Sequence, residues 1–221
     1  MKFTAWQTNE PYTEGFYGDQ RTLHGGRWSV AVSSPPAVEP ITRDQAKANA
    51  RVEHTDLDTD FDAWIVAARQ HAEHVLRRAL ITQTIKLRLD QFPRGRRIEL
   101  PAPPLQSVTS ITYLDRDGAT QTLSANNYDV DPYGLVGSIV LKENLAWPAT
   151  ESGVPNAVTI EYTAGYGDAA DDVPQEIRTG LLYLTNHFYS QPDMVVTGSI
   201  ATSVQNTFEA LMTPYRVPQA F

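Results

Sequence analysis

Three absences narrow the chemistry that is open to this chain of 221 residues. The sequence has no cysteine, which excludes disulfide bonds, thiolate metal sites and cysteine nucleophiles. Its uninterrupted apolar runs are only a few residues long, far short of the roughly 20 residues that a transmembrane helix needs. The first residues contain a single Lys and no apolar run, which argues against a signal peptide. We therefore expect no contact with a membrane.

Positive charge is also scarce. Lys and Arg number 18 against 26 Asp and Glu, which gives a formal net charge of −8. Proteins that grip DNA through its phosphates are usually basic, so tight DNA binding is not expected. An acidic surface can still surround a duplex and let it slide, because it repels the phosphates. The hydrophobic fraction of 41% is enough for a core and indicates a folded domain of ordinary size.

Three segments have helical signatures. Thr42 and Gln45 form a capping-box pattern at the start of a short helix over about 42–52. Over about 58–80 an apolar stripe recurs at spacings of three and four, which predicts an amphipathic helix. Pro174 fits the first turn of a third helix over about 173–190. We expect the second and third helices to form the core pair.

Between those helices the apolar period changes to two. Ile85, Leu87 and Leu89 alternate with polar residues and predict a half-buried strand. Turn residues around Gly118 predict a hairpin, and several further short strands follow. The region 82–164 is therefore predicted to be an antiparallel β insertion in an α+β fold.

The two ends of the chain lack regular periodicity. Residues 1–37 are rich in aromatics and predict an extended N-terminal arm, which packs on its own domain or orders on a neighbour or partner. Residues 38–204 are then the main domain. In the C-terminal segment 205–221, one or two amphipathic turns are followed by Pro214 and Pro218, which favour an extended tail.

A search for a catalytic or metal site finds no strong motif. The sequence has no GxSxG, no HExxH and no Gly-rich loop ending in GK[ST], and the AGYGD segment lacks the third glycine of a dinucleotide fingerprint. His71 and His74 are neighbours on a helix and could form half a metal site, but a solvated face is favoured. Alternating aspartates resemble part of a calcium loop, but they lack its glycine and distal glutamate: Asp56, Asp58, Asp60 and Asp62. We expect no catalysis, no cofactor and no bound metal.

One tight basic cluster is present. Arg94, Arg96 and Arg97 lie in a turn between two predicted strands. They form either a solvated turn or a contact to an acidic partner surface or to passing DNA. Proteins that bind single-stranded nucleic acid typically have exposed aromatics interleaved with their basic residues, and this cluster has none.

The order of these segments resembles the head–tail connector (adaptor) proteins of long-tailed bacteriophages and gene transfer agents. The likeness is carried by EPITRDQAKANARVE, by the long helix and its exit ALITQT, by LPAPPLQSVTSITYLDRDG, by NLAWPAT, by the AGYGD segment with the helix after it, and by EALMTPYRV. It is collinear over about residues 38–217. Residues 1–37 have no counterpart in that pattern.

The resemblance implies a structural role in the neck of a virion assembled in the cytoplasm of a host bacterium. Copies of the chain would form a closed ring of about twelve beneath the portal, with one interface repeated around it. The ring would join the portal to a head-closure or tail-tube protein, and double-stranded DNA would pass through it without specific binding.

The resemblance also implies that the C-terminal segment binds the portal. Its candidate contacts are Phe208, Leu211, Tyr215, Arg216, Val217 and Phe221. Alternatively, Phe208 and Leu211 cover the chain's own core. On the portal-binding interpretation, deletion of 205–221 should leave the domain folded and abolish portal binding.

Three other functions stay open at this stage. The first is another joining part of a virion, such as a head-closure or tail-terminator protein, although two long helices argue against those mostly β-rich folds. The second is a small metal-dependent enzyme using His71 and His74. The third is a DNA-binding protein, which retarded migration of duplex DNA would reveal.

Overall fold

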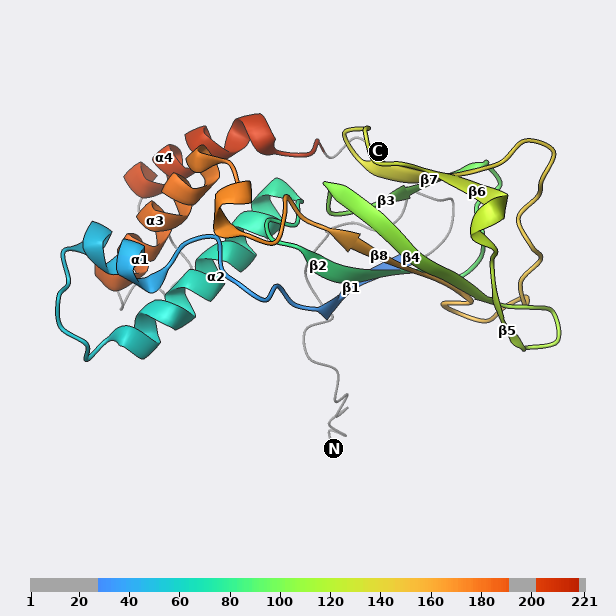
Figure 1. Cartoon of the computed structure of the whole chain (residues 1–221), viewed down its shortest axis with the longest axis horizontal. Coiled ribbons are helices and arrows are strands. Elements are labelled where there is room, and N and C mark those ends of the chain that lie inside the picture. The colour runs from blue at the N-terminus through green and yellow to red at the C-terminus, as the bar shows by residue number, and fades with distance from the viewer. Residues whose placement is uncertain (1–27, 191–201, 219–221) are drawn as a thin grey trace, which may run out of the picture.

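The computed structural model describes residues 28–190 and 202–218 as an elongated molecule with two lobes (Figure 1). Helices gather at one end and two antiparallel sheets at the other. This arrangement confirms the predicted α+β class. None of the described helices is both long enough and apolar enough to cross a membrane.

The first helix, α1 (Arg43–Ala50), begins where the capping-box pattern predicts. The Thr42 hydroxyl accepts from the backbone N–H of Gln45 at 3.2 Å, and the Gln45 side chain accepts from the N–H of Thr42 at 2.9 Å. Two backbone donors at the start of the helix are satisfied in this way. Arg51 adopts a left-handed conformation and ends the helix.

The core pair of the helical lobe is α2 (Asp58–Leu76) and α3 (Gln175–Ser190). Their apolar stripes are buried in one cluster, as predicted, and include Phe61, Ile65, Ala68, Ala72, Leu76, Ile177, Leu181 and Leu184. The helix α2 ends four residues before the predicted residue 80. Arg77 takes a left-handed conformation with φ of 56°, and this terminates the helix before Leu80.

The β lobe contains two sheets. A five-stranded sheet has the order β1 (Trp28–Ser34), β2 (Gln83–Leu89), β8 (Val158–Ala164), β4 (Leu105–Leu114) and β5 (Thr120–Thr122). A three-stranded sheet has the order β3 (Arg97–Leu100), β7 (Gly137–Leu141) and β6 (Tyr128–Asp131). Every described strand pair is antiparallel, which confirms the predicted β insertion.

The assignment of residues 28–34 to an irregular arm is wrong. These residues form β1, which pairs with β2 from Trp28 opposite Leu89 to Ser34 opposite Thr84. Only the Trp28 side chain is buried, and the interior of the strand is half-buried on both faces. An edge strand held mainly by backbone hydrogen bonds has a weak alternation of apolar and polar residues, so its sequence pattern is faint. Residues 35–37 are irregular, as predicted, and residues 1–27 lie outside the described residues.

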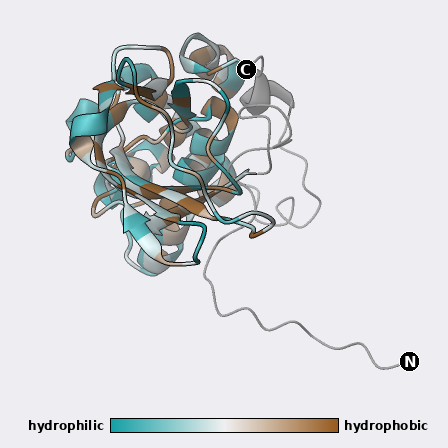
Figure 2. Ribbon diagram, turned by 90° about the vertical axis from the view of Figure 1, so that its right-hand side faces the viewer, coloured by the Kyte–Doolittle hydropathy of each residue, from teal (hydrophilic) through white to brown (hydrophobic). Residues whose placement is uncertain are grey.

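A second core lies between the sheets, apart from the helical core. It collects the inward residues of the strands, including Ile85, Leu87, Ile98, Ile139 and Ile160. In the end-on view of Figure 2, hydrophobic and hydrophilic bands alternate along the ribbons of this lobe. That alternation is what the period of two in the sequence requires.

A buried polar network joins the two lobes where α2 leads into β2. The Glu73 carboxylate is fully buried and accepts from Arg69 at 2.9 Å, from the Leu80 N–H at 3.0 Å and from Gln83 at 2.9 Å. Arg69 also donates to Glu39 at 2.7 Å. Burial raises the pKa of the Glu73 carboxyl, and these donors offset the cost of burying it.

Candidate interaction surfaces

The C-terminal segment is a packed part of the helical lobe, not an extended tail. Its helix α4 (Thr202–Met212) lies against α3, and a 3-10 turn (Thr213–Tyr215) follows it (Figure 1). Phe208 is 2% exposed, Met212 1% and Val217 5%. Gly180 lets α3 and α4 approach closely, because a Cβ there would lie 2.3 Å from the Met212 methyl carbon.

Polar contacts fix the residues after α4. The Val217 N–H donates to the Leu76 carbonyl at 3.0 Å, and the Arg78 side chain donates to the Tyr215 carbonyl at 2.6 Å. The Tyr215 hydroxyl donates to Glu176 at 2.9 Å. Deletion of 205–221 would remove these buried side chains from the core, so we now predict that it destabilises the domain and does not leave it folded.

The predicted portal contacts fall into three groups. Phe208 and Val217 are buried within the chain, which agrees with the alternative that Phe208 covers its own core. Leu211 and Tyr215 are half-buried and Arg216 is exposed. Phe221 lies outside the described residues. Portal binding by the accessible members stays a prediction.

The arginine cluster spans the turn before β3 and the first residue of that strand, Arg97, and its three side chains have different surroundings. Arg97 donates to Ser138 at 2.7 Å and pairs with Asp131 at 3.5 Å, while Arg96 donates to the Leu141 carbonyl at 2.7 Å. Arg94 is exposed beside a hollow of about 750 Å³. Two of the three arginines thus already have hydrogen-bond partners within the chain. A contact of the cluster with DNA or with a partner protein stays a prediction.

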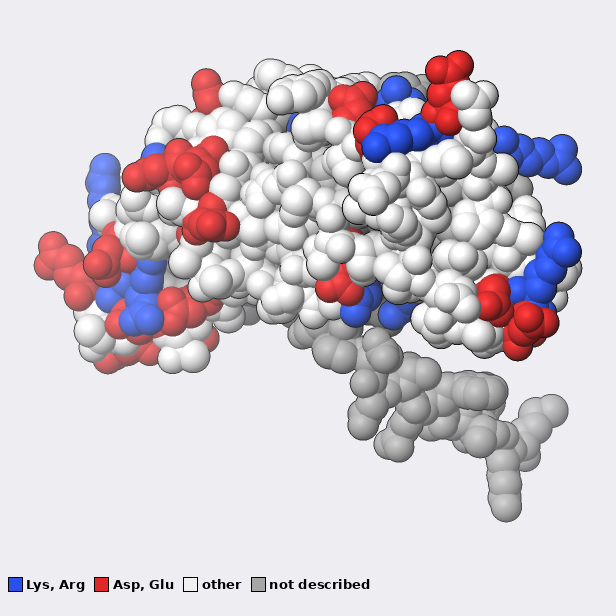
Figure 3. All heavy atoms as spheres, turned by 45° about the vertical axis from the view of Figure 1, so that its right-hand side comes forward, with Lys and Arg blue, Asp and Glu red and all other residues white. Residues whose placement is uncertain are grey.

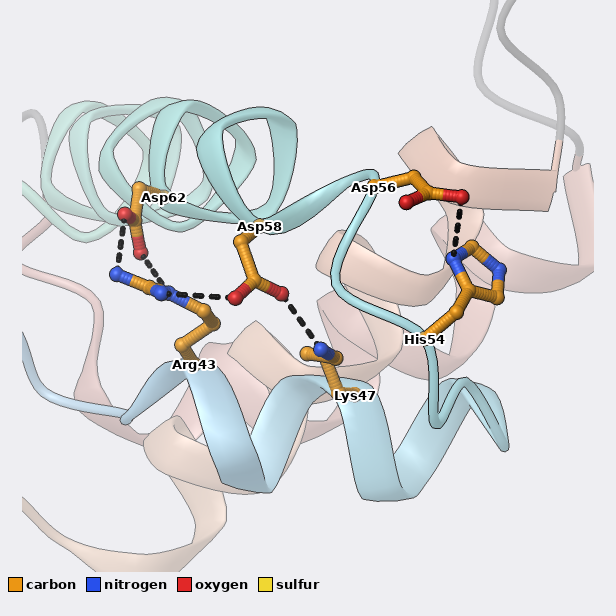
Figure 4. A network of polar contacts seen from close by, with 6 residues as sticks. All are labelled: Arg43, Lys47, His54, Asp56, Asp58 and Asp62. Carbon is orange, nitrogen blue, oxygen red and sulfur yellow. Dashed lines mark hydrogen bonds and ion pairs between the residues drawn. The ribbon is translucent and has the colours of Figure 1, made fainter.

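Two of the four aspartates that resemble a calcium loop pair with cations of α1, whereas Asp56 pairs with His54 at 3.9 Å (Figure 4). Asp58 bridges Lys47 at 2.5 Å and Arg43 at 3.1 Å, and Arg43 also contacts Asp62 at 2.7 Å. The hydrogen bond from Lys47 holds the pKa of the Asp58 carboxyl below its usual value. These carboxylates tie α2 to α1. In residues 28–190 and 202–218 no three acidic, His or Cys side chains gather as a metal site would require.

The two helix histidines differ in environment. His71 is half-buried, with its ring centre 5.6 Å from that of Phe208, whereas His74 is exposed. Burial, together with the neighbouring His74, lowers the pKa of His71. His71 therefore packs against Phe208 of α4, and His74 faces solvent.

Charged side chains are unevenly spread. In the view of Figure 3, acidic groups gather over the helical end with a few basic side chains among them, and basic side chains project from the β end beside further acidic groups.

One turn of the β lobe carries an apolar surface that sequence reasoning missed. Tyr133, in the turn between β6 and β7, is 95% exposed. The signal was present as PYGLV, an apolar sequence where a hairpin turn is normally polar.

No protein-family model matches the chain, and no curated protein matches it significantly. Solved structures do match. A chain from the virion of a native gene transfer agent particle is 19% identical, with a TM-score of 0.71, over 87% of this chain and 97% of that one. A chain from the neck of an empty particle, computed with C6 symmetry, is 19% identical with a TM-score of 0.69 over 86% and 97%. A chain from the neck of a native particle, computed with C12 symmetry, is 21% identical with a TM-score of 0.63 over 86% and 97%. This chain therefore has the same fold as these particle proteins.

Proposed function

We propose that this chain is a structural neck protein of a phage-like particle, forming a ring that joins the portal to the head-closure or tail proteins. The observation that carries the proposal is the fold match, which spans 97% of each chain from a gene transfer agent neck. A match over almost the whole length leaves no separate domain of those chains without a counterpart here. The role involves assembly and has no catalytic step.

The symmetry of the matched necks supports a ring. Those structures were computed with C6 and C12 symmetry, so chains with this fold occur in rotationally symmetric surroundings. A closed ring needs a head-to-tail contact between two different surfaces of one chain. The net charge of −8 suits a ring through which DNA passes without being held.

The portal contact is assigned to the accessible face of the C-terminal segment. Arg216 is exposed, and the half-buried Leu211 and Tyr215 lie in the same segment. Aromatic and arginine side chains commonly dominate interface energies. Because Phe208 and Val217 are buried, their part is to hold this face in place.

Analytical ultracentrifugation of the purified protein, alone and with its cognate portal ring, tests the proposal. We expect a species with the mass of the portal plus a full complement of subunits. Arg216→Glu should weaken that complex without changing the melting temperature, whereas Arg116→Glu, an exposed arginine in the β4–β5 turn, should not. A folded protein that forms no complex with the portal would refute the proposed function.

A further inference from the structure

Half of the strongly exposed large apolar side chains in the described residues lie in one hairpin. Six large hydrophobic side chains are strongly exposed, and three of them belong to the hairpin of β6 and β7: Val130 at 38%, Tyr133 at 95% and Leu135 at 49%. We call residues 130–136 the hairpin tip. Side chains this exposed lower solubility, so a cluster of them at one turn indicates a contact surface.

A second apolar surface lies in a hollow of the helical lobe. A hollow of about 670 Å³ lies between the segment before α1, the N-terminal half of α2 and the loop that follows β8. Its apolar lining is Val38, Ile41, Ile65, Val66, Ala169 and Ala170, and polar residues complete it: Glu39, Thr42, Arg43, Asp62 and Asp168. Val38 is itself 44% exposed. We call this hollow the helical groove. Together the hairpin tip and the helical groove hold four of the six exposed hydrophobics.

The hairpin tip and the helical groove belong to different lobes. The hairpin is part of the three-stranded sheet of the β lobe, and the groove is built on α1 and α2 of the helical lobe (Figure 1). The tip does not line its own groove. A projecting apolar surface and an apolar hollow on one chain are the two halves of a head-to-tail contact.

We propose that the hairpin tip of one copy inserts into the helical groove of the next copy around the ring. This inference rests on the proposed function and adds the surfaces through which the copies meet. Polar groups match as well. Asp168 is an exposed carboxylate at the rim of the groove, and no hydrogen bond or ion pair to it is found in the described part of the chain. The Tyr133 hydroxyl offers the donor that such a carboxylate would accept from.

The small size of the hairpin tip also favours a ring over a pair. Stable complexes bury about 800 Å² on each partner, whereas the tip offers three strongly exposed apolar side chains. A contact of this size is weak alone but is repeated at each junction of a closed ring. We therefore expect the tip and groove to engage when the copies are already held side by side.

The absence of cysteine permits a direct test by site-specific cross-linking. The double variant Leu135→Cys with Val38→Cys places one thiol at the tip and one at the groove, both on exposed positions. With the portal ring and a short bis-maleimide, we expect a ladder of covalent multimers on a denaturing gel. Each single variant should give no ladder. A matched control, Leu145→Cys with Val38→Cys, uses a residue of the β lobe that is 44% exposed but lies outside the tip.

The outcomes separate the two proposals. If the double variant forms the full complex with the portal in the ultracentrifuge but gives no ladder, the tip-in-groove contact is refuted and the neck function stands. If the unmodified protein forms no complex, the proposed function fails first. A second variant, Tyr133→Ser, should weaken ring assembly at least tenfold. Its control, Leu145→Ser, should leave assembly unchanged. Equal assembly of the two variants would also refute the tip-in-groove contact.

Discussion

Phe208→Ala offers a quantitative test of the C-terminal packing. The side chain is 2% exposed, and it packs between α2 and α3, near His71 and Gly180. A buried aromatic covers about 150–250 Å² of surface, and truncation to Ala in a core costs about 3–5 kcal/mol. We expect a loss of that size, in the upper half of the range if α4 cannot move toward α3 to fill the space.

Urea unfolding followed by circular dichroism measures this loss. Tyr183→Ala is the matched control, since Tyr183 is an aromatic residue on α3 that is 44% exposed. We expect it to cost less than about 1 kcal/mol, because nearly half of its surface stays in water in both states and it lies outside the core. Equal, small losses for both variants would refute the packing of α4 on the core and would support an extended C-terminal tail instead. The m-values should agree with the unsubstituted protein, so that the difference in midpoint reports stability.

Two further substitutions test the core. Glu73→Gln keeps an acceptor for the Leu80 N–H but loses the charged hydrogen bond with Arg69, so the free energy of unfolding should fall by about 1.5–3 kcal/mol. The control is Glu161→Gln, which removes a partly exposed ion pair with Lys86 and should cost at most about 1 kcal/mol. Similar costs for both in the same urea titration would contradict the burial of the network. Trp64→Ala should cost about 1.5–3 kcal/mol, roughly half the value for a fully buried aromatic. Trp64 is half-buried and packs edge-on against Phe61 at 5.2 Å between ring centres; no change in its melting curve would show that this contact contributes nothing.

The parts of the fold that the sequence predicts are those with a strong local period. The strand β2 has a strict alternation of buried and half-buried residues, and α2 keeps one apolar stripe over five turns. Such patterns follow from the burial of a single face, so they can be read without knowledge of the partner element. The division of the β insertion into two sheets depends on long-range pairing, which has no local signature.

The elements that local sequence patterns do not predict are held by contacts with residues far away in the sequence. The strand β1 is held by the backbone of β2, whose paired residues lie 50 to 61 positions later, and its own side chains alternate only weakly. The segment after α4 is held by Leu76, the last residue of α2, and by Arg78 just beyond it, although Pro214 favoured an extended tail. In both cases tertiary hydrogen bonds supply the order that local propensity does not.

The AGYGD segment illustrates how a motif can be structural. Gly165 has a φ of +136°, and a Cβ at this position would lie 2.5 Å from the backbone carbon of Ile81. The glycine is needed because the chain leaving β8 crosses the connection between α2 and β2 at close range. Its neighbour Gly167 accepts from the Thr82 N–H at 2.9 Å and so continues the same contact. The missing third glycine argues against a dinucleotide site here. Only the topology shows that the glycines allow two chain segments to cross closely.

Separate surfaces for portal binding and for ring contact have a consequence for assembly. The proposed tip-in-groove contact is too small to hold two free copies together, but copies bound side by side on a portal meet at an effective concentration in the millimolar range. Each bound copy would then raise the affinity of the next one, so occupancy should rise steeply with protein concentration. Tyr133→Ser should make the binding curve shallower while leaving the first binding step unchanged, and Arg216→Glu should weaken the first step itself. A titration of the portal ring by mass photometry separates these effects, and an identical response of both variants would mean that the two surfaces act as one.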